Sequence, residues 1–197
     1  MINRAQRDEL RRKGGAYVEM FKSMSAAVAN ELADVHFVDP DVVYDGELEI
    51  DLGGHTVVLR HVGPAHSVGD QAVIVDDRIL FGGDLLETRR FAIVPYFPPF
   101  DVDVDARRWI EVLDACLALR PEIVVPGHGE VADTTLIRDV REYLAFVRDE
   151  AARLRASGAS PARTAATIGT AARARWSTWE DPYWIDFAAQ AFYSAAA

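Results

Sequence analysis

Apolar residues recur along the chain with two periods, one of three to four positions and one of two. The longer period is typical of helices with one buried side and predicts them over residues 4–33, 105–119 and 134–156, and again from Ser160-Pro161 onward. The shorter period is typical of strands and predicts them over residues 47–52, 55–61, 72–75, 79–81 and 122–125. The order of these elements predicts an α/β chain.

Pairs of adjacent glycines or aspartates interrupt the pattern of apolar residues at three places. Gly53-Gly54 and Asp76-Asp77 each separate two short strands and predict two tight hairpin turns. Gly14-Gly15 interrupts the first helical stretch, and we expect a break there or two helices in place of one. The segment from residue 85 to 105 carries four aromatic residues and three prolines and predicts a long loop that could wall a pocket.

Composition narrows the class of protein. The 197 residues are 50% hydrophobic and 26% charged, which suits one soluble domain with an appendage. The net charge of -10 disfavours a nucleic-acid partner, because phosphate binding needs basic surface. No apolar run approaches the ~20 residues of a membrane span, and the first residues show no export signal, which predicts a cytoplasmic protein without a membrane partner. The single cysteine, Cys116, falls on an apolar helical stripe and predicts a small core residue.

Three residues are the candidates for chemistry: His66, Asp84 and His128. Each follows a short strand-like run and lies in a segment rich in glycine or proline. If those strands are neighbours in one sheet, the three side chains converge at one edge of it. Two imidazoles and a carboxylate are a common ligand set for zinc or iron. The neighbouring glycines permit the tight turns that would direct such side chains inward.

The motifs around these residues are GPAHSVGD at 63–70, FGGD at 81–84 and PGHG at 126–129. With them the chain resembles the metallo-β-lactamase superfamily, of the glyoxalase II-like kind, over about residues 45–155. The resemblance implies a layered αββα sandwich, N-terminally incomplete here, with extra C-terminal helices. It implies a partial metallo-β-lactamase-like domain at 1–156 and a helical appendage packed on it at 157–197.

The resemblance also implies roles for the candidate residues. His66 would bind one metal of a binuclear pair, Asp84 would bridge both metals, and His128 would bind the other. An aspartate at position 84 is similar to the glyoxalase II-type hydrolases, whereas the common β-lactamases have cysteine there. Asp70 would orient the His66 loop through hydrogen bonds. The implied cofactor is zinc, two ions in an intact site, with iron or manganese as alternatives.

One family motif is absent. The His-x-His-x-Asp-His sequence that supplies further metal ligands does not occur in this chain. We therefore expect the chain to be a truncated member of the family, with partial or no metal occupancy and an exposed sheet face.

Three functions follow from the resemblance. The first is metal-dependent hydrolysis of an ester, thioester or lactam-like bond in a small molecule by a metal-bound hydroxide, impaired by the missing motif. The second is a catalytically inactive member that acts as an oligomerising or binding module. Its self-association would use the exposed sheet or the C-terminal helices, which hold Trp176, Trp179 and Trp184. The third is an iron-dependent redox relative.

Overall fold

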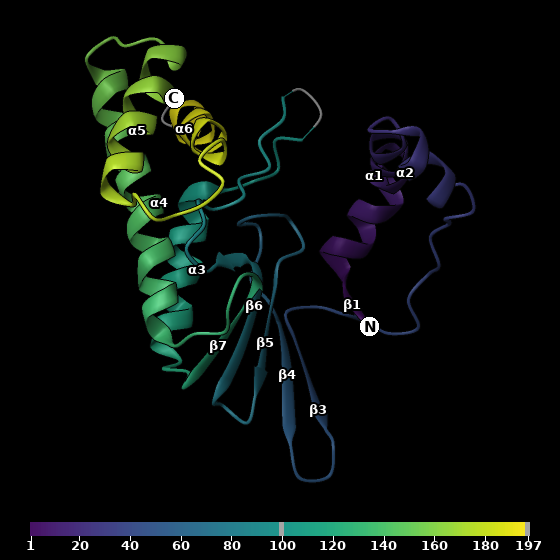
Figure 1. Ribbon diagram of the computed structural model, residues 1–197. Coiled ribbons are helices and arrows are strands. Elements are labelled where there is room, and N and C mark those ends of the chain that lie inside the picture. Colours follow the sequence, from purple (N-terminus) through teal and green to yellow (C-terminus); the bar gives the residue numbers. More distant parts are fainter. Residues whose placement is uncertain (99–100, 196–197) are drawn as a thin grey trace.

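A five-stranded sheet forms the centre of the computed structural model, which describes residues 1–98 and 101–195 (Figure 1). Its strands lie in the order β3-β4-β5-β6-β7. Their bounds are Glu47–Asp51, Thr56–His61, Gln71–Val75, Ile79–Glu87 and Ile123–His128. The pairs β3/β4, β4/β5 and β5/β6 are antiparallel, and β7 pairs in parallel with β6. The mixed sheet and the helices around it confirm the predicted α/β class.

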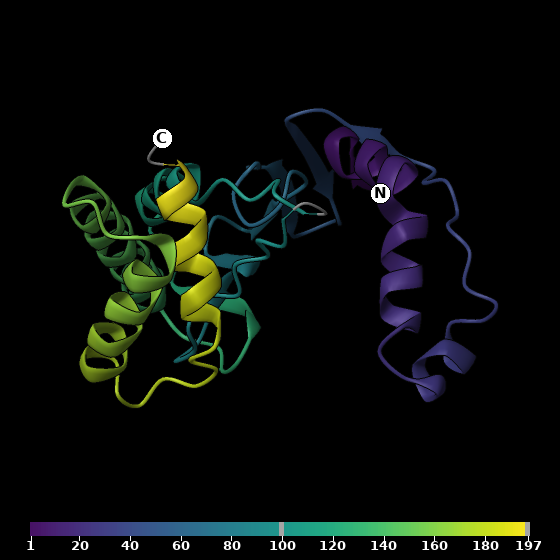
Figure 2. The ribbon, with the colours of Figure 1, turned by 90° about the horizontal axis from the view of Figure 1, so that it is seen from above.

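Helices α3 to α6 lie together on one side of the molecule (Figures 1 and 2). Their bounds are Ala106–Ala118, Thr134–Ala156, Pro161–Arg175 and Trp184–Ala195. Helices α3 and α4 bury the apolar stripes that their sequences predict, including Cys116 at 3% exposure. The aromatic residues after α5 pack on the same core, since Trp179 contacts Phe91 and Tyr143. The domain boundary at residue 156 stays a prediction.

An N-terminal arm stands on the other side of the sheet and its loops (Figure 2). It consists of β1 (Ile2–Asn3), α1 (Arg4–Lys22), α2 (Ala26–Glu31) and β2 (Val43–Tyr44), and β1 pairs in parallel with β2. Asn3 donates a hydrogen bond to the carbonyl of Gly69, which ties the arm to the loop after β4. Among the described residues, no helix combines the length and the apolar character that crossing a membrane requires.

The first helical stretch forms two helices, but the break does not lie at Gly14-Gly15 as predicted. Helix α1 continues through both glycines and ends before Ser23, and Ser25 then caps α2. Glycine lowers helix stability by only about 1 kcal/mol per residue, which the contacts of a helix can offset. Gly14 also has a packing role, because a Cβ there would lie 2.7 Å from Phe37 Cε2.

The two hairpin turns are confirmed. Asp76 and Asp77 both have positive φ, 53° and 54°, and so have Gly53 and Gly54, at 73° and 136°. These turns fix the register of the antiparallel strands. The predicted end of β6 at residue 81 is wrong, however. The strand continues to Glu87, because its parallel pairing with β7 resumes after an irregularity at Gly83.

Candidate metal centre

Asp84 and His128 lie side by side at one edge of the sheet. Asp84 falls within β6, and His128 is the last residue of β7, where a loop was predicted for both. Because β6 and β7 are parallel, the two strands bring these side chains to the same edge. His128 Nε2 is 3.5 Å from Asp84 Oδ1, and the two side chains are 47% and 45% exposed. The pair is therefore open to a ligand.

Glycine permits this close approach. A Cβ at Gly127 would overlap the Asp84 carboxylate, and it would lie 2.8 Å from the carbonyl carbon of Gly83 and 2.9 Å from the Asp84 nitrogen. Gly83 itself has a φ of 53°, a conformation that side chains disfavour. The close packing of Asp84 and His128 thus explains, on steric grounds, why the FGGD and PGHG motifs contain glycine.

The separation of the pair fits two ligands of one ion. Carboxylate oxygen and imidazole nitrogen bind zinc at about 2.0–2.2 Å, so two such ligands at a tetrahedral angle lie roughly 3.3–3.5 Å apart. A zinc site in proteins draws on three or four protein ligands. Across residues 1–98 and 101–195, no group of three or more His, Cys, Asp or Glu side chains is placed to hold a metal ion. Asp84 and His128 are therefore two adjacent side chains with the spacing that two such ligands require.

Among the described residues, His66 does not complete a metal-holding group with this pair. Its ring packs edge-on against the buried Trp109 of α3, with 5.6 Å between ring centroids, and its side chain is 16% exposed. The structure therefore joins two of the three predicted ligands, and the role of His66 as a ligand stays a prediction.

The loop that carries His66 is held by its own hydrogen bonds. Asp70 accepts hydrogen bonds from the Ser67 nitrogen at 3.0 Å and from Ser67 Oγ at 2.6 Å. Asp70 Oδ1 also lies 3.7 Å from His66 Nδ1. His61 Nε2 lies 2.9 Å from the carbonyl oxygen of Val68. Asp70 has the position that orienting the loop requires, and its effect on metal binding stays a prediction.

Glu87 is a buried carboxyl group on β6, beside the candidate centre. It is paired in register with His128 and has no exposed surface. Its Oε1 accepts a hydrogen bond from the Ile93 nitrogen at 3.3 Å, and its Oε2 has no hydrogen-bond partner among the described residues. Burial, opposed in part by this hydrogen bond, raises the pKa of Glu87 well above its ordinary value. From the sequence we expect Glu87 to be a supporting or surface carboxylate, and its full burial was not predicted because the strand was expected to end before it.

Replacing Glu87 by glutamine should change the pH dependence of stability. The folded state keeps this carboxyl protonated above pH 4.5, where the unfolded chain ionises it. The wild-type free energy of unfolding therefore falls as pH rises from 4.5 toward the raised folded pKa, by up to about 1.4 kcal/mol per pH unit. Glu87→Gln should remove this slope in urea unfolding, and Glu122→Gln at an exposed ion pair should retain it. An unchanged slope in Glu87→Gln would contradict the assignment.

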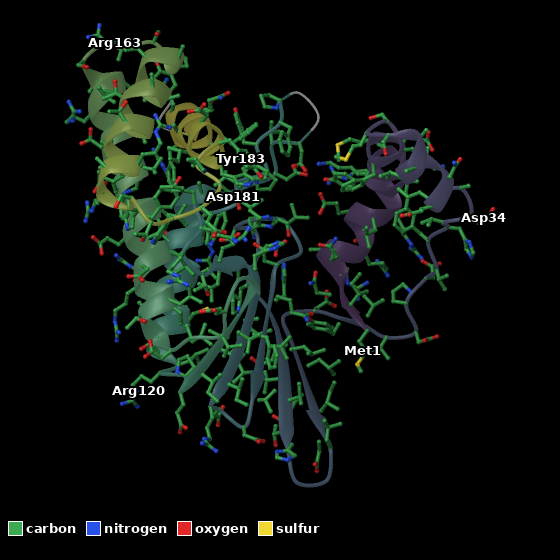
Figure 3. All side chains as sticks on the ribbon, viewed as in Figure 1. Met1, Asp34, Arg120, Arg163, Asp181 and Tyr183 are labelled. Carbon is green, nitrogen blue, oxygen red and sulfur yellow. The ribbon has the colours of Figure 1, made fainter. Side chains whose placement is uncertain are left out.

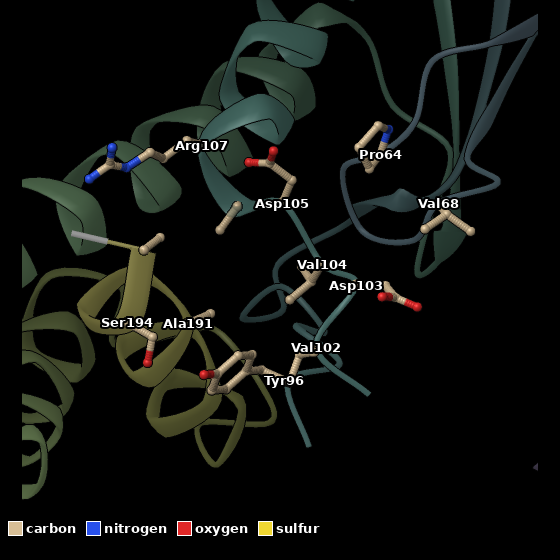
Figure 4. A pocket seen from close by; sticks show the side chains of 12 residues that line it. Pro64, Val68, Tyr96, Val102, Asp103, Val104, Asp105, Arg107, Ala191 and Ser194 are labelled. Atoms are coloured by element: carbon tan, nitrogen blue, oxygen red, sulfur yellow. The ribbon is translucent and has the colours of Figure 1, made fainter. Parts of the chain in front are cut away.

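A pocket of about 610 Å³ adjoins the His66 loop (Figure 4). Pro64 and Val68 line it from that loop, Tyr96 and the 102–105 segment from the long connection, and Ala191 from α6. The described part of the 85–105 segment thus contributes Tyr96 and residues 102–105 to a pocket. Residues 99 and 100 lie outside the described residues. Asp84 and His128 do not line this pocket.

The fold and the paired Asp and His motifs agree with the family comparison. The sequence matches the metallo-beta-lactamase superfamily over residues 3–128, more than half of the chain. The chain belongs to this superfamily.

Individual relatives are more distant. The type 2 metallo-beta-lactamase of Bacteroides fragilis is 27% identical over 108 residues, which are 53% of this chain and 42% of that protein. The sec-alkylsulfatase Pisa1 of Pseudomonas sp. superposes with a TM-score of 0.59 at 16% identity, over 81% of this chain and 27% of that one. An archaeal superfamily member from Sulfolobus tokodaii gives a TM-score of 0.45 at 26% identity, over 64% of this chain and 51% of that one. The chain thus spans less than half the length of the curated relative that it matches.

Proposed function

We propose that this chain takes part in metal-dependent hydrolysis of an ester, thioester or lactam-like bond in a small molecule. The observation that carries the proposal is the Asp84–His128 pair, 3.5 Å apart and half exposed. Both residues lie within the part of the chain that matches the metallo-beta-lactamase superfamily. Zinc is the metal we propose, because one carboxylate and one imidazole are ligands that it accepts.

The two residues have complementary tasks in this proposal. Asp84 contributes a negative charge, and His128 contributes a neutral nitrogen donor when its ring is deprotonated. A bound divalent ion supplies the Lewis acidity that lowers the pKa of water toward neutrality. Gly83 and Gly127 keep the two donors at the spacing of one ion, so the site needs little rearrangement to accept it.

Zinc binding should depend on Asp84 more than on Asp70. In calorimetric titrations with Zn²⁺, Asp84→Ala and His128→Ala should each weaken binding at least about tenfold, since each removes one of two ligands. Asp70→Ala should weaken it less, because Asp70 hydrogen-bonds the neighbouring loop. Equal losses in Asp84→Ala and Asp70→Ala would argue against Asp84 as a ligand.

The chain offers a matched control. His55 and Asp76 form a second exposed histidine–aspartate pair, with His55 Nδ1 2.6 Å from Asp76 Oδ2. This spacing is that of a direct hydrogen bond and is shorter than that of two ligands sharing one zinc ion. His55→Ala should leave zinc affinity unchanged. A loss as large as that of His128→Ala would mean that zinc binds exposed histidines without selectivity.

A second candidate is a binding or assembly module without catalysis. The observation that favours it is that the described part of the chain gathers only two of the three predicted ligands. Zinc-loaded protein should be assayed with a p-nitrophenyl ester and a chromogenic β-lactam. Turnover that disappears in Asp84→Ala supports hydrolysis, and zinc binding without turnover supports the second candidate.

A further inference from the structure

The N-terminal arm is attached to the rest of the molecule without sharing its hydrophobic core. Among the described residues, none from α1 or α2 belongs to the core cluster, and none packs against it from outside. Helix α1 buries only Glu9 and Gly14. At the base of the arm, Asn3 donates a hydrogen bond of 2.8 Å to the carbonyl of Gly69. Elements with few buried apolar contacts open at a low free energy while the rest of the fold stays intact, so polar contacts hold the arm in place.

Three side chains on one face of α1 reach the last part of the connection between β6 and α3. Glu9, Lys13 and Tyr17 are spaced four positions apart, so they share a face of the helix. The Lys13 ammonium group contacts the Asp103 carboxylate and lies 3.7 Å from Asp101 Oδ1. The Tyr17 hydroxyl donates a hydrogen bond of 2.8 Å to Asp101 Oδ2. We call these five residues the latch.

Lys13 balances the charges of the latch. Glu9 Oε1 lies 3.6 Å from Lys13 Nζ, so one ammonium group is shared by three carboxylates. The side chains of Asp101, Asp103 and Glu9 are 18%, 26% and 5% exposed. Arg12 also approaches Asp103, at 3.7 Å, but its side chain is 61% exposed and therefore screened by water. Carboxylates shielded from water repel one another unless a cation lies between them, so removing the Lys13 charge should push the arm and the segment apart.

The segment 101–105 connects the latch to the pocket of Figure 4. Its residues 102–105 line one side of this pocket, which has a volume of about 610 Å³. The Asp105 nitrogen donates a hydrogen bond of 2.8 Å to the carbonyl of Ala65, in the loop after β4. The Asp105 side chain caps α3 by accepting a hydrogen bond of 2.8 Å from the Arg108 nitrogen. A shift of this segment would therefore change the pocket wall, the loop after β4 and the start of α3 together.

We propose that docking of the N-terminal arm controls the shape of this pocket, because the latch holds the 101–105 segment that forms one of its walls. With the arm docked, the segment is restrained by the latch at its start and by the bond to Ala65 at its end. With the arm released, only the second restraint remains, and the pocket wall moves. Asp84 and His128 do not line the pocket, so the latch acts independently of zinc binding by that pair.

Hydrogen exchange of the full chain, followed for each amide by NMR, tests the proposal. Lys13→Gln leaves the carboxylates of the latch without their ammonium group, so the arm should detach. The amides of Asp101 and Asp105, which donate to the carbonyls of Phe97 and Ala65, should then exchange roughly tenfold faster or more. Amides within α4 should keep their wild-type rates, because that helix belongs to the core. Unchanged exchange at Asp101 and Asp105, or equal acceleration throughout α4, would overturn the proposal.

Arg11→Gln is the matched control, since it removes one positive charge from the same helix. Arg11 Nη2 lies 2.7 Å from Asp39 Oδ1, and the two side chains are 56% and 71% exposed and outside the latch. Exchange at Asp101 and Asp105 should stay at the wild-type rate. Acceleration as large as that of Lys13→Gln would show that the net charge of the arm, and not the latch, controls the segment.

A double-mutant cycle tests the direct contact between Lys13 and Asp103. Lys13→Gln and Asp103→Asn should each accelerate exchange of the Asp105 amide. The double variant removes both partners and leaves one carboxylate fewer without a cation, so it should exchange more slowly than the product of the two single effects implies. Multiplicative effects on the rate would mean that the two residues act separately and would contradict the latch.

Spin labels measure the docking of the arm itself. Asp34 lies on the arm and Arg163 on the far helical side of the molecule, and both are exposed (Figure 3). Labels at Asp34→Cys and Arg163→Cys should give a narrow distance distribution by pulsed electron paramagnetic resonance, and Lys13→Gln should broaden it. The native Cys116 is buried and should remain unlabelled. The same distribution with and without Lys13→Gln would show that the arm stays docked without the latch, against the proposal.

Discussion

Gly127→Ala should separate Asp84 from His128 and abolish zinc binding. The added Cβ would overlap the Asp84 carboxylate and would also lie within 2.9 Å of the Asp84 nitrogen. Because the backbone cannot rotate away as a flexible side chain can, β6 and β7 must move apart at their paired ends. Overpacking of this kind destabilises a fold by about 1–3 kcal/mol, and here it also removes the ligand spacing.

The experiment combines calorimetric zinc titration with urea unfolding of the same variant. Gly15→Ala is its control, because the structure shows no atom within 4 Å of the added Cβ. Gly15 lies inside α1, where alanine should raise the free energy of unfolding by up to about 1 kcal/mol. If Gly127→Ala binds zinc as wild type does, the close approach of the two strands is not required for the site.

Local patterns predicted most of the secondary structure. The bounds of α4 agree at both ends, because Asp133 caps its start and Gly158, with a φ of 79°, follows its end. Both hairpins were predictable because the residues that tolerate positive φ stand between alternating strands. The extension of β6 was not predictable, since it depends on pairing with β7, more than forty residues later in the chain.

The candidate site was predictable to the extent that strand ends determine it. Asp84 and His128 follow apolar runs that the fold places in adjacent parallel strands, and the pair results from that adjacency. The orientation of His66 depends instead on Trp109, which reaches it from a helix elsewhere in the sequence. The residues around His66 in the sequence therefore do not predict its contact with Trp109.

The pairing of β6 with β7 determines the position of the candidate site. Phe81 lies three positions before Asp84 on β6. The same pairing that aligns Phe81 with Val125 brings Asp84 near His128.

Trp109→Ala should be the most destabilising single substitution in the core. Trp109 is fully buried in α3, and its Nε1 donates a hydrogen bond of 3.1 Å to the carbonyl of Leu85 on β6. Its removal leaves a large cavity between the helix and the sheet and an acceptor without its donor. The expected loss is about 3–5 kcal/mol in the free energy of unfolding, with a further contribution from the unpaired carbonyl.

Two further variants separate the contributions in urea unfolding. Trp109→Phe fills most of the cavity but lacks the donor, so it should recover more than half of the loss. Trp184→Ala removes a tryptophan that is only partly buried, against Phe97 and Phe187, and should cost clearly less than Trp109→Ala. His66, which rests edge-on against Trp109, should also become more reactive toward diethyl pyrocarbonate in Trp109→Ala. Equal losses for Trp109→Ala and Trp184→Ala would show that the contact between α3 and β6 does not anchor the sheet.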